Sequence, residues 1–233
     1  MSSTALILER VSLGPRQGPA LLEEVSLSLE PGQSCLVLAE PHQSLTALIK
    51  VAAGLSAPRA GRVSWFGHDA TALAPRRLAL LRCRIGLVRQ ASALVSNLTI
   101  GGNLTLGPMY HHGLGWDQAN RRALAVAGPL GLEPVWDLRP VDLPVWQRRM
   151  ALYARELIME PELLLLELPE LDLGGEEYDM MMSAVADTVR RGRAALLMGA
   201  LQPQVRGLSC DLVLRLSQGR GRVAPGAGGG GEP

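Results

Sequence analysis

The sequence carries few side chains that could do covalent or metal chemistry, and their spacing limits what that chemistry can be. Of its 23 Lys and Arg residues only Lys50 is a lysine, so a mechanism that needs a lysine amine has one candidate. Cys35, Cys83 and Cys210 are odd in number and far apart, and the four histidines are no better spaced. This pattern fits neither a disulfide framework nor a zinc site. We interpret these residues as packing residues and expect no metal site from them.

Composition and charge exclude several function classes. A chain of 233 residues has the length of one domain, and with 47% hydrophobic residues it can bury a large core, which excludes intrinsic disorder. A net charge of +1, with four Trp, three Tyr and one Phe, provides neither a basic field nor stacking platforms, so we expect no nucleic-acid partner. The N-terminus lacks the basic-then-apolar order of a signal peptide, so we expect a cytoplasmic protein.

The elements that would position a site alternate between strands and helices. Residues 25–29 alternate like a half-buried edge strand, residues 34–39 form an apolar run, and residues 45–53 have helical spacing. Further strands are expected at 85–88, 163–166, 194–198 and 211–216, and further helices at 118–129, 147–159 and 183–191. Buried strands separated by helices predict an α/β fold with a mainly parallel sheet covered on both faces. From residue 219 onward Gly, Pro and Ala dominate, so we expect a flexible tail at 219–233.

Three long blocks in fixed order resemble the nucleotide-binding domain of ATP-binding cassette (ABC) transporters. They are PGQSCLVLAEPHQSLTALIKVAAGL, GRVSWFGHDATALAPRRLALLRCRIGLVRQ and RRMALYARELIMEPELLLLELP, and the resemblance covers residues 5–223. It implies a P-loop NTPase-like ABC ATPase fold, with helices on both faces of a mainly parallel sheet and an antiparallel β subdomain. It also implies a helical subdomain at roughly 91–160, within a domain that spans residues 1–218.

The family's phosphate loop, G-x-x-G-x-G-K-[ST], falls on a segment in which only the last residue fits. The segment consists of Ala39, Glu40, Pro41, His42, Gln43, Ser44, Leu45 and Thr46. Glycines there let backbone amides approach phosphate, and the lysine ammonium neutralises the β and γ charges. Leu45 replaces that lysine, Glu40 adds a repelling carboxylate, and Lys50 lies about 7.5 Å further along the helix by helix rise, so it is no substitute. We favour a strand-to-helix turn that binds no phosphate.

The signature LSGGQ, whose amides and serine would bind a partner's γ-phosphate, is also changed. It falls on Leu143, Pro144, Val145, Trp146 and Gln147, so the serine and both glycines are gone. The bulk of the residues that replace the glycines would fill the space that the phosphate needs. We interpret this segment as the packed start of a helix.

Two further motif positions keep their residue type and others lose it. Gln90 stands where the family has its glutamine loop, which contacts the catalytic metal and the membrane subunit. Glu167 keeps a carboxylate for magnesium, so Thr46 and Glu167 would be the ligands if Mg²⁺ binds. Leu168 replaces the glutamate that polarises the attacking water, and leucine has no group that accepts a proton. The switch histidine and the D-loop aspartate fall on an alanine, Ala200, and a glycine, Gly174.

This pattern predicts a catalytically degenerate ABC subunit, a pseudo-ATPase, for which we expect no cofactor. The alternative is an active ATPase that uses ATP and Mg²⁺ through Thr46, Gln90 and Glu167; a decayed gene product is a third reading. The resemblance implies an ABC permease as partner, a homodimer or a heterodimer with another ABC ATPase subunit, and a peripheral position on the cytoplasmic face of the inner membrane.

The segment that follows Gln90 keeps its family character, and we expect it to dock on the permease. The expected contacts are Leu94, Val95, Leu98 and Ile100, partly exposed beside a groove between the sheet and residues 118–129. Residues 96–114, SNLTIGGNLTLGPMYHHGL, are similar to the ABC ATPases that serve MCE-type lipid transport between membranes. Lipid transport is therefore one expectation for the cargo, with other solutes left open.

Overall fold

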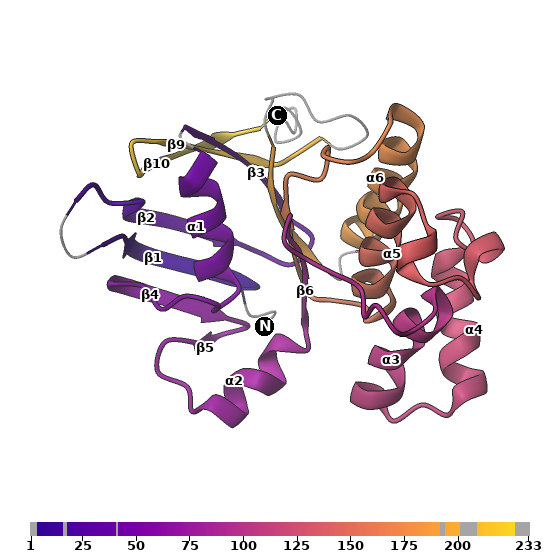
Figure 1. Ribbon diagram of the computed structural model, residues 1–233. Coiled ribbons are helices and arrows are strands. Elements are labelled where there is room, and N and C mark those ends of the chain that lie inside the picture. Colours follow the sequence, from indigo (N-terminus) through magenta and orange to yellow (C-terminus); the bar gives the residue numbers. More distant parts are fainter. Residues whose placement is uncertain (1–3, 16–17, 41, 192–193, 201–208, 227–233) are drawn as a thin grey trace.

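The structure is a computed structural model that describes residues 4–15, 18–40, 42–191, 194–200 and 209–226 (Figure 1). Its strands are β1 (Leu6–Leu13), β2 (Leu22–Leu29), β3 (Ser34–Glu40), β4 (Ala60–Trp65), β5 (His68–Asp69), β6 (Ile85–Val88), β7 (Leu163–Glu167), β8 (Ala195–Gly199), β9 (Leu212–Ser217) and β10 (Arg220–Pro225). Its helices are α1 (His42–Ala52), α2 (Pro75–Arg82), α3 (Ile100–His112), α4 (Trp116–Ala127), α5 (Val145–Ile158) and α6 (Gly175–Arg190), with 3₁₀ turns η1 (Glu133–Val135) and η2 (Pro140–Asp142).

Within the described residues the strands form one sheet in the order β5-β4-β1-β2-β10-β9-β3-β8-β7-β6. The half that carries β9, β3, β8, β7 and β6 is parallel. The half that carries β5, β4, β1 and β2 is antiparallel, and it meets the parallel half through β10. The α/β fold with a mainly parallel sheet and an antiparallel β part is confirmed.

Two hydrophobic clusters cover the two faces of the parallel strands. On one face α1 buries Leu45, Leu48 and Ile49 against the sheet and against the antiparallel strands. On the other face α5 and α6 pack directly on the strands, and α3 and α4 pack beyond them (Figure 1). The carboxyl ends of β3, β7 and β8 therefore lie between a helix on each side, which is where ligands bind in sheets of this kind.

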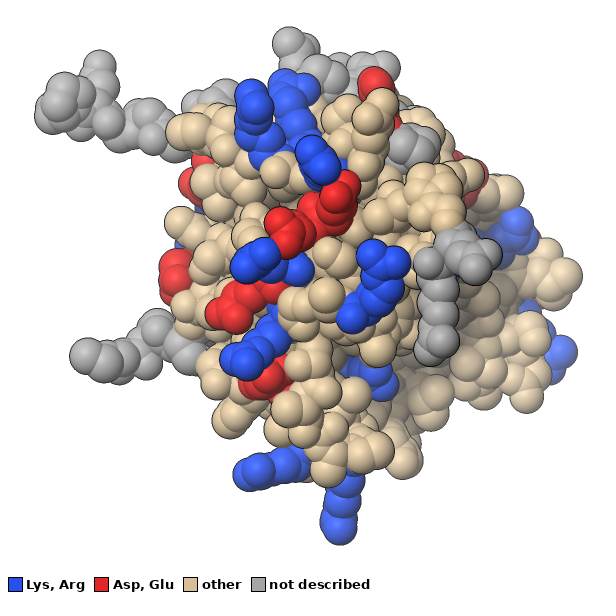
Figure 2. Space-filling model, turned by 90° about the vertical axis from the view of Figure 1, so that its left-hand side faces the viewer, with Lys and Arg blue, Asp and Glu red and all other residues tan. Residues whose placement is uncertain are grey.

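The exposed side of the antiparallel strands carries charges of both signs in alternation (Figure 2). Arg10 pairs with Glu24 at 2.5 Å, and Arg220 pairs with Glu23 at 3.0 Å. Both pairs are solvent-exposed, so they contribute little to stability.

Two parts of the fold differ from the sequence-based expectation. Strand β2 is interior, because β1 flanks it on one side and β10 on the other through the Arg220–Glu23 pairing. Residues 220–225 were expected in the tail, but they form β10 and pair with β9 along their whole length. The hairpin between β9 and β10 is possible because its two turn residues, Gln218 and Gly219, both adopt positive φ, 49° and 82°. A two-residue turn between twisted antiparallel strands requires such angles.

The helices also depart from expectation at their ends. Helix α6 begins at Gly175, eight residues before the predicted start, and α1 begins at His42 rather than at residue 45.

Among the described residues no helix is long and apolar enough to span a membrane.

Candidate functional site

The junction between β3 and α1 is short. Strand β3 ends at Glu40 and α1 begins at His42, and Pro41 between them lies outside the described residues. A phosphate loop needs a run of non-helical residues whose amides face the ligand. Here His42, Gln43 and Ser44 already belong to the helix, so these three amides start an ordinary helical turn.

The side chains of this segment point in different directions. Glu40, His42 and Gln43 are exposed, whereas Ala39 and Ser44 are buried. Glu40 and His42 border a small cavity of about 300 Å³ at the carboxyl end of β3. A carboxylate at this place disfavours an anionic ligand.

Leu45 is part of the core. It is 1% exposed, and its side chain lies directly over Gly199 at the end of β8, in the space that a Cβ at position 199 would occupy. Leu45 therefore packs α1 onto the sheet. At the position where the motif has its phosphate-binding lysine, this chain has a leucine that buries apolar surface.

A methyl group at position 199 should therefore be costly. We expect Gly199→Ala to lower the free energy of unfolding by about 1–3 kcal/mol, because the added Cβ forces Leu45 out of its position. Urea unfolding followed by circular dichroism measures this, and Gly115→Ala, where φ is −66° and no atom lies within 4 Å of the added Cβ, separates the steric cost from backbone effects. Equal stability of Gly199→Ala and the wild type would contradict the packing of Leu45.

Thr46 and Glu167 do come together, as the motif predicts. The hydroxyl of Thr46 donates to Oε1 of Glu167 at 2.5 Å, and Glu167 is 1% exposed. The second oxygen, Oε2, lies 3.3 Å from Nε of Arg89 in an ion pair. A buried carboxylate needs such a partner, and here the chain supplies it from its own residues.

Sequence reasoning did not identify Arg89 or the arginine behind it. Arg149, on α5, is 4% exposed and donates from Nη1 to the carbonyl oxygen of Arg89 at 2.9 Å. Its guanidinium lies 5.9 Å from the ring centroid of Tyr153, and burial raises the pKa of that phenol. A polar layer thus runs inside the molecule from Thr46 to Tyr153. In the sequence, the one indication of this polar layer is Arg89, which stands next to Gln90 at the end of a predicted strand.

The positions of the family's catalytic glutamate and switch histidine are packing positions. Leu168 and Ala200 are each 6% exposed. The amide of Leu168 donates to the carbonyl oxygen of Gly199 at 2.9 Å, and Leu168 has a φ of 49°. Neither side chain accepts a proton. Gly174, at the D-loop position, is the N-cap residue of α6.

The signature segment lies at the start of α5. Leu143 is buried, Pro144 precedes the helix with an extended backbone, and no side chain caps it. Val145 is 49% exposed, whereas Trp146 packs against the second hydrophobic cluster and Gln147 is half-buried. The segment is a helix start with bulky residues where the motif has glycines.

Gln90 is exposed and follows β6, and the residues after it lead to the expected docking segment. Of the expected contacts, Val95 is 41% exposed, and Leu94 and Leu98 are half-buried. Ile100 is fully buried beneath α3, so the expectation that it is partly exposed is wrong. Ile100 is the first residue of the helix, and its side chain anchors that helix in the core.

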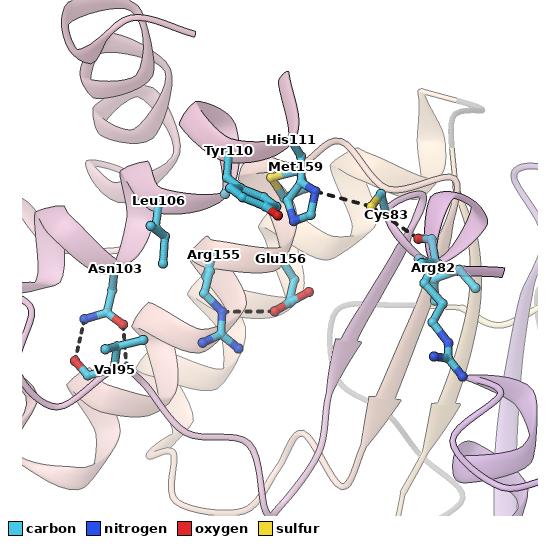
Figure 3. A pocket seen from close by; sticks show the side chains of 13 residues that line it. Arg82, Cys83, Val95, Asn103, Leu106, Tyr110, His111, Arg155, Glu156 and Met159 are labelled. Carbon is cyan, nitrogen blue, oxygen red and sulfur yellow. Dashed lines mark hydrogen bonds and ion pairs between the residues drawn. The ribbon is translucent and has the colours of Figure 1, made fainter. Parts of the chain in front are cut away.

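A groove of about 540 Å³ opens beside Val95, between α2, β6, α3 and α5. It does not involve residues 118–129, because α4 packs on the far side of α3 (Figure 1). Leu106 and Tyr110 of α3, 49% and 80% exposed, line it together with Arg155 and Glu156 of α5 (Figure 3). We call this feature the apolar groove.

The polar groups of the apolar groove are mostly paired with one another. Nε of Arg155 lies 3.1 Å from Glu156, and Glu156 also accepts a hydrogen bond from the amide of Leu87. Burial raises the pKa of Glu156, and Arg155 opposes that rise. Cys83 lies 3.4 Å from Nδ1 of His111 (Figure 3). Among the described residues, no group of three or more His, Cys, Asp or Glu side chains could hold a metal ion.

Comparison with protein families decides the classification. The model of the family described as "ABC transporter" matches residues 22–169, more than half of the chain. The chain belongs to the ABC transporter family. In this family it is similar to MetN 2 of Burkholderia mallei, a methionine import ATP-binding protein, with 30% identity over 91% of this chain and 54% of that protein. The chain thus spans about half the length of the MetN 2 relatives it matches.

Other ABC transporter relatives match over more of their length. FtsE of Escherichia coli, a cell division ATP-binding protein, is 27% identical over 69% of this chain and 72% of its own. PhnC 1 of Rhodopseudomonas palustris, a phosphonates import ATP-binding protein, is 28% identical over 85% of this chain and 79% of its own.

Solved structures agree on the fold. A dimeric ATP-binding cassette bound to ADP and Pi superimposes with a TM-score of 0.86 at 19% identity, over 94% of this chain and 98% of that chain. The protein cbiO1 of Clostridium perfringens, part of an ABC transporter complex, superimposes with a TM-score of 0.79 at 20% identity, over 94% and 87%. These likenesses confirm the ABC ATPase fold.

The comparisons overturn one expectation. We expected no cofactor, but the ABC relatives are named as ATP-binding proteins, and the solved cassette holds ADP and Pi. The expectation that this chain uses no nucleotide cofactor is therefore wrong. The argument from the changed loop assumed that a nucleotide can be held only by that loop.

The β3–α1 junction nevertheless does not fit a triphosphate with Mg²⁺ in the way the motif prescribes. Leu45 faces the core, Glu40 brings an exposed carboxylate to the cavity, and Arg89 occupies one oxygen of Glu167. We derive no catalytic step at this junction.

Proposed function

We propose that this chain is the ATP-binding subunit of an ABC transporter, that it docks on a membrane permease through the apolar groove, and that its own site is impaired in hydrolysis. The observation that carries the proposal is the apolar groove directly after Gln90, with large exposed apolar side chains around it. Membership of the family supports the transporter part of this proposal.

The groove has the chemistry of a protein-binding site. Val95, Leu106 and Tyr110 expose apolar surface on its rim. Contiguous exposed apolar surface on a folded domain marks an interaction site. Its occupant is a short helix of the permease, with apolar side chains toward Leu106 and Tyr110.

The loop at the rim of the groove is held rigid, which suits a docking role. The side chain of Asn103 is 1% exposed, accepts from the amide of Val95 at 2.7 Å and donates to its carbonyl oxygen at 3.1 Å. Arg155 donates from Nη1 to the carbonyl oxygen of Ala93 at 2.9 Å. A preformed surface loses little conformational entropy when a partner binds.

The second part of the proposal concerns hydrolysis. Leu168 is buried and has no proton acceptor, and Ala200 stands in place of a histidine. A missing electrostatic or proton-accepting group costs about 10²–10³ in rate, and such losses within one site are not additive. The alternative, an active ATPase, relies on Thr46, Gln90 and Glu167 alone.

For the cargo we propose lipid transport of the MCE type. Its support is the similarity of residues 96–114, which in the structure supply α3 and much of the groove. The same segment would therefore determine which permease is recognised.

Docking can be tested by aspartate substitutions on the groove. We expect Leu106→Asp and Tyr110→Asp each to release the chain from its permease, because a desolvated carboxylate in an apolar interface is unfavourable. Val141→Asp is the matched control, since Val141 is 75% exposed on η2, away from the groove. The measurement is co-purification of the tagged chain with membranes of the native host, with melting curves to confirm folding.

The outcomes separate the alternatives. Retention of both groove variants on membranes, or failure of the wild type to associate at all, would refute docking through this surface. Phosphate release by the wild-type complex above about 1 s⁻¹, within the ordinary range of enzymes, would establish the active ATPase instead.

A further inference from the structure

Charge is distributed unevenly along this chain, although its net charge is only +1. Residues 70–116 contain no Asp or Glu and carry five arginines: Arg76, Arg77, Arg82, Arg84 and Arg89. The rest of the chain holds the other 18 of the 23 basic residues and all 22 acidic ones, so its net charge is −4 against +5 for this segment. Such an asymmetry favours contact with an anionic partner.

Three of the five arginines already have partners within the chain. Arg84 and Arg89 pair with glutamates, and Arg82 donates to a backbone carbonyl oxygen. Arg76 and Arg77 are exposed, and they form no ion pair with any residue that the structure describes. The positive charge that this segment offers to a partner is therefore concentrated at these two positions.

The two arginines lie where their charge does not help the fold. They stand in the first turn of α2, which has no acidic residue in that turn. Cations are unfavourable at this end of a helix, because the helix dipole is positive there. Leu78 and Leu81 pack against the first hydrophobic cluster, whereas Leu80 is 67% exposed. Since Leu80 follows the arginines by three and four positions, the outward face of α2 combines two cations with an apolar side chain.

The turn between α3 and α4 lies beside α2 and exposes an aromatic side chain. Sγ of Cys83, directly after α2, is 3.4 Å from Nδ1 of His111, near the end of α3. Trp116, the first residue of α4, is 54% exposed. Figure 1 shows α2 and this turn at the same lower edge of the molecule, and blue side chains project from the lower edge of Figure 2 without a red neighbour. We call this surface, formed by Arg76, Arg77, Leu80 and Trp116, the basic end.

We propose that the basic end contacts anionic lipid headgroups at the surface of a bilayer. The guanidinium groups of Arg76 and Arg77 bind headgroup phosphates, for which arginine has the matching donor geometry. Leu80 and Trp116 enter the boundary between headgroups and acyl chains, where tryptophan is enriched in membrane proteins. These apolar side chains beside the cations favour a lipid surface over nucleic acid, whose phosphate backbone has no apolar layer to receive them.

The lipid contact goes beyond docking on a permease, because it needs no second protein. The basic end adjoins the apolar groove, since Ala79 and Arg82 of α2 line that groove. A chain held in the groove by a permease would therefore turn the basic end toward the membrane. The lipid contact does not use Leu106 or Tyr110, on which docking relies, so the two proposals can fail separately.

The test is co-sedimentation of the full chain with lipid vesicles in the absence of a permease. We expect the chain to bind vesicles of phosphatidylglycerol and phosphatidylcholine at low salt, and to bind vesicles of phosphatidylcholine alone about tenfold more weakly or less. Arg76→Gln combined with Arg77→Gln should weaken binding to the anionic vesicles about tenfold or more. Added salt should weaken it as well, because it screens exposed charges.

The matched control is Arg215→Gln combined with Arg222→Gln, which removes the same charge from exposed positions on β9 and β10. This control and Leu106→Asp should both bind anionic vesicles like the wild type. Anionic vesicles should also shift the tryptophan fluorescence of the wild type to the blue, and Trp116→Phe should remove that shift. Melting curves of each variant report whether it is folded.

Three results would overturn the proposal. The first is an absence of wild-type binding to anionic vesicles at millimolar lipid and low salt. The second is equal binding of the Arg76→Gln, Arg77→Gln variant and of its control. The third is binding of single-stranded RNA as tight as that of the vesicles and unchanged by Leu80→Asp, which would make the basic end a nucleic-acid surface instead.

Discussion

Replacement of Arg89 by methionine is expected to lower the free energy of unfolding by about 3–5 kcal/mol, because it leaves a buried carboxylate without its cation. Glu167 is 1% exposed, and its Oε2 has Arg89 as its ion-pair partner at 3.3 Å. The remaining hydrogen bond from Thr46 satisfies only Oε1. Methionine keeps most of the volume of the side chain, so the change measures the charge rather than a cavity.

A matched control lies at the other end of the same strand. Arg84 precedes β6 and pairs with Glu162 at 2.5 Å, but the two side chains are 38% and 46% exposed. Arg84→Met also removes the contact of its guanidinium with the Phe66 ring at 3.9 Å, so it should cost about 1–2 kcal/mol, less than Arg89→Met. Urea unfolding of both variants gives the comparison.

The double variant Arg89→Met with Glu167→Gln tests the mechanism further. If the loss in Arg89→Met comes from an uncompensated charge, removal of that charge should recover a large part of it. A loss that is the same with Gln as with Glu at position 167, or a cost of Arg89→Met no larger than that of Arg84→Met, would contradict the role of Arg89 as the counterion.

The sequence predicted those strands whose signal is local. Residues 34–39 and 163–166 are apolar runs, and each became a buried strand because a central parallel strand is covered on both faces. Residues 85–88 became the half-buried strand β6 at the edge of the sheet. The same reasoning failed for β10, whose residues are all exposed. Strand β10 is stabilised by backbone pairing with β9 after a tight turn, and the hydropathy of its residues does not indicate that pairing.

The site needed the order of the strands, which no local pattern contains. Strand β6 lies beside β7, although more than seventy residues separate them, and Val88 is in register with Leu166. Only this register places Arg89 next to Glu167. Motif positions could be read from the sequence, but their neighbours could not.

A substitution toward the family motif should be harmful here. We expect Leu45→Lys to lower the free energy of unfolding by about 3–5 kcal/mol, because it removes a buried leucine and places an ammonium group against Gly199. Leu45→Met is the control for volume, and it should cost less than about 1.5 kcal/mol. Thermal and urea unfolding of the purified variants provide the measurement.

The same variant should gain no hydrolysis. A lysine at position 45 supplies charge, but Leu168 still accepts no proton and the signature segment still carries Val145 and Trp146. Phosphate release by Leu45→Lys, measured with its partners, should therefore equal that of the wild type. A stable Leu45→Lys protein with increased phosphate release would mean that the residues after Glu40 leave the helix and form a phosphate loop. In that case Leu45 would be an adaptation of a working site and not a core residue that has replaced it.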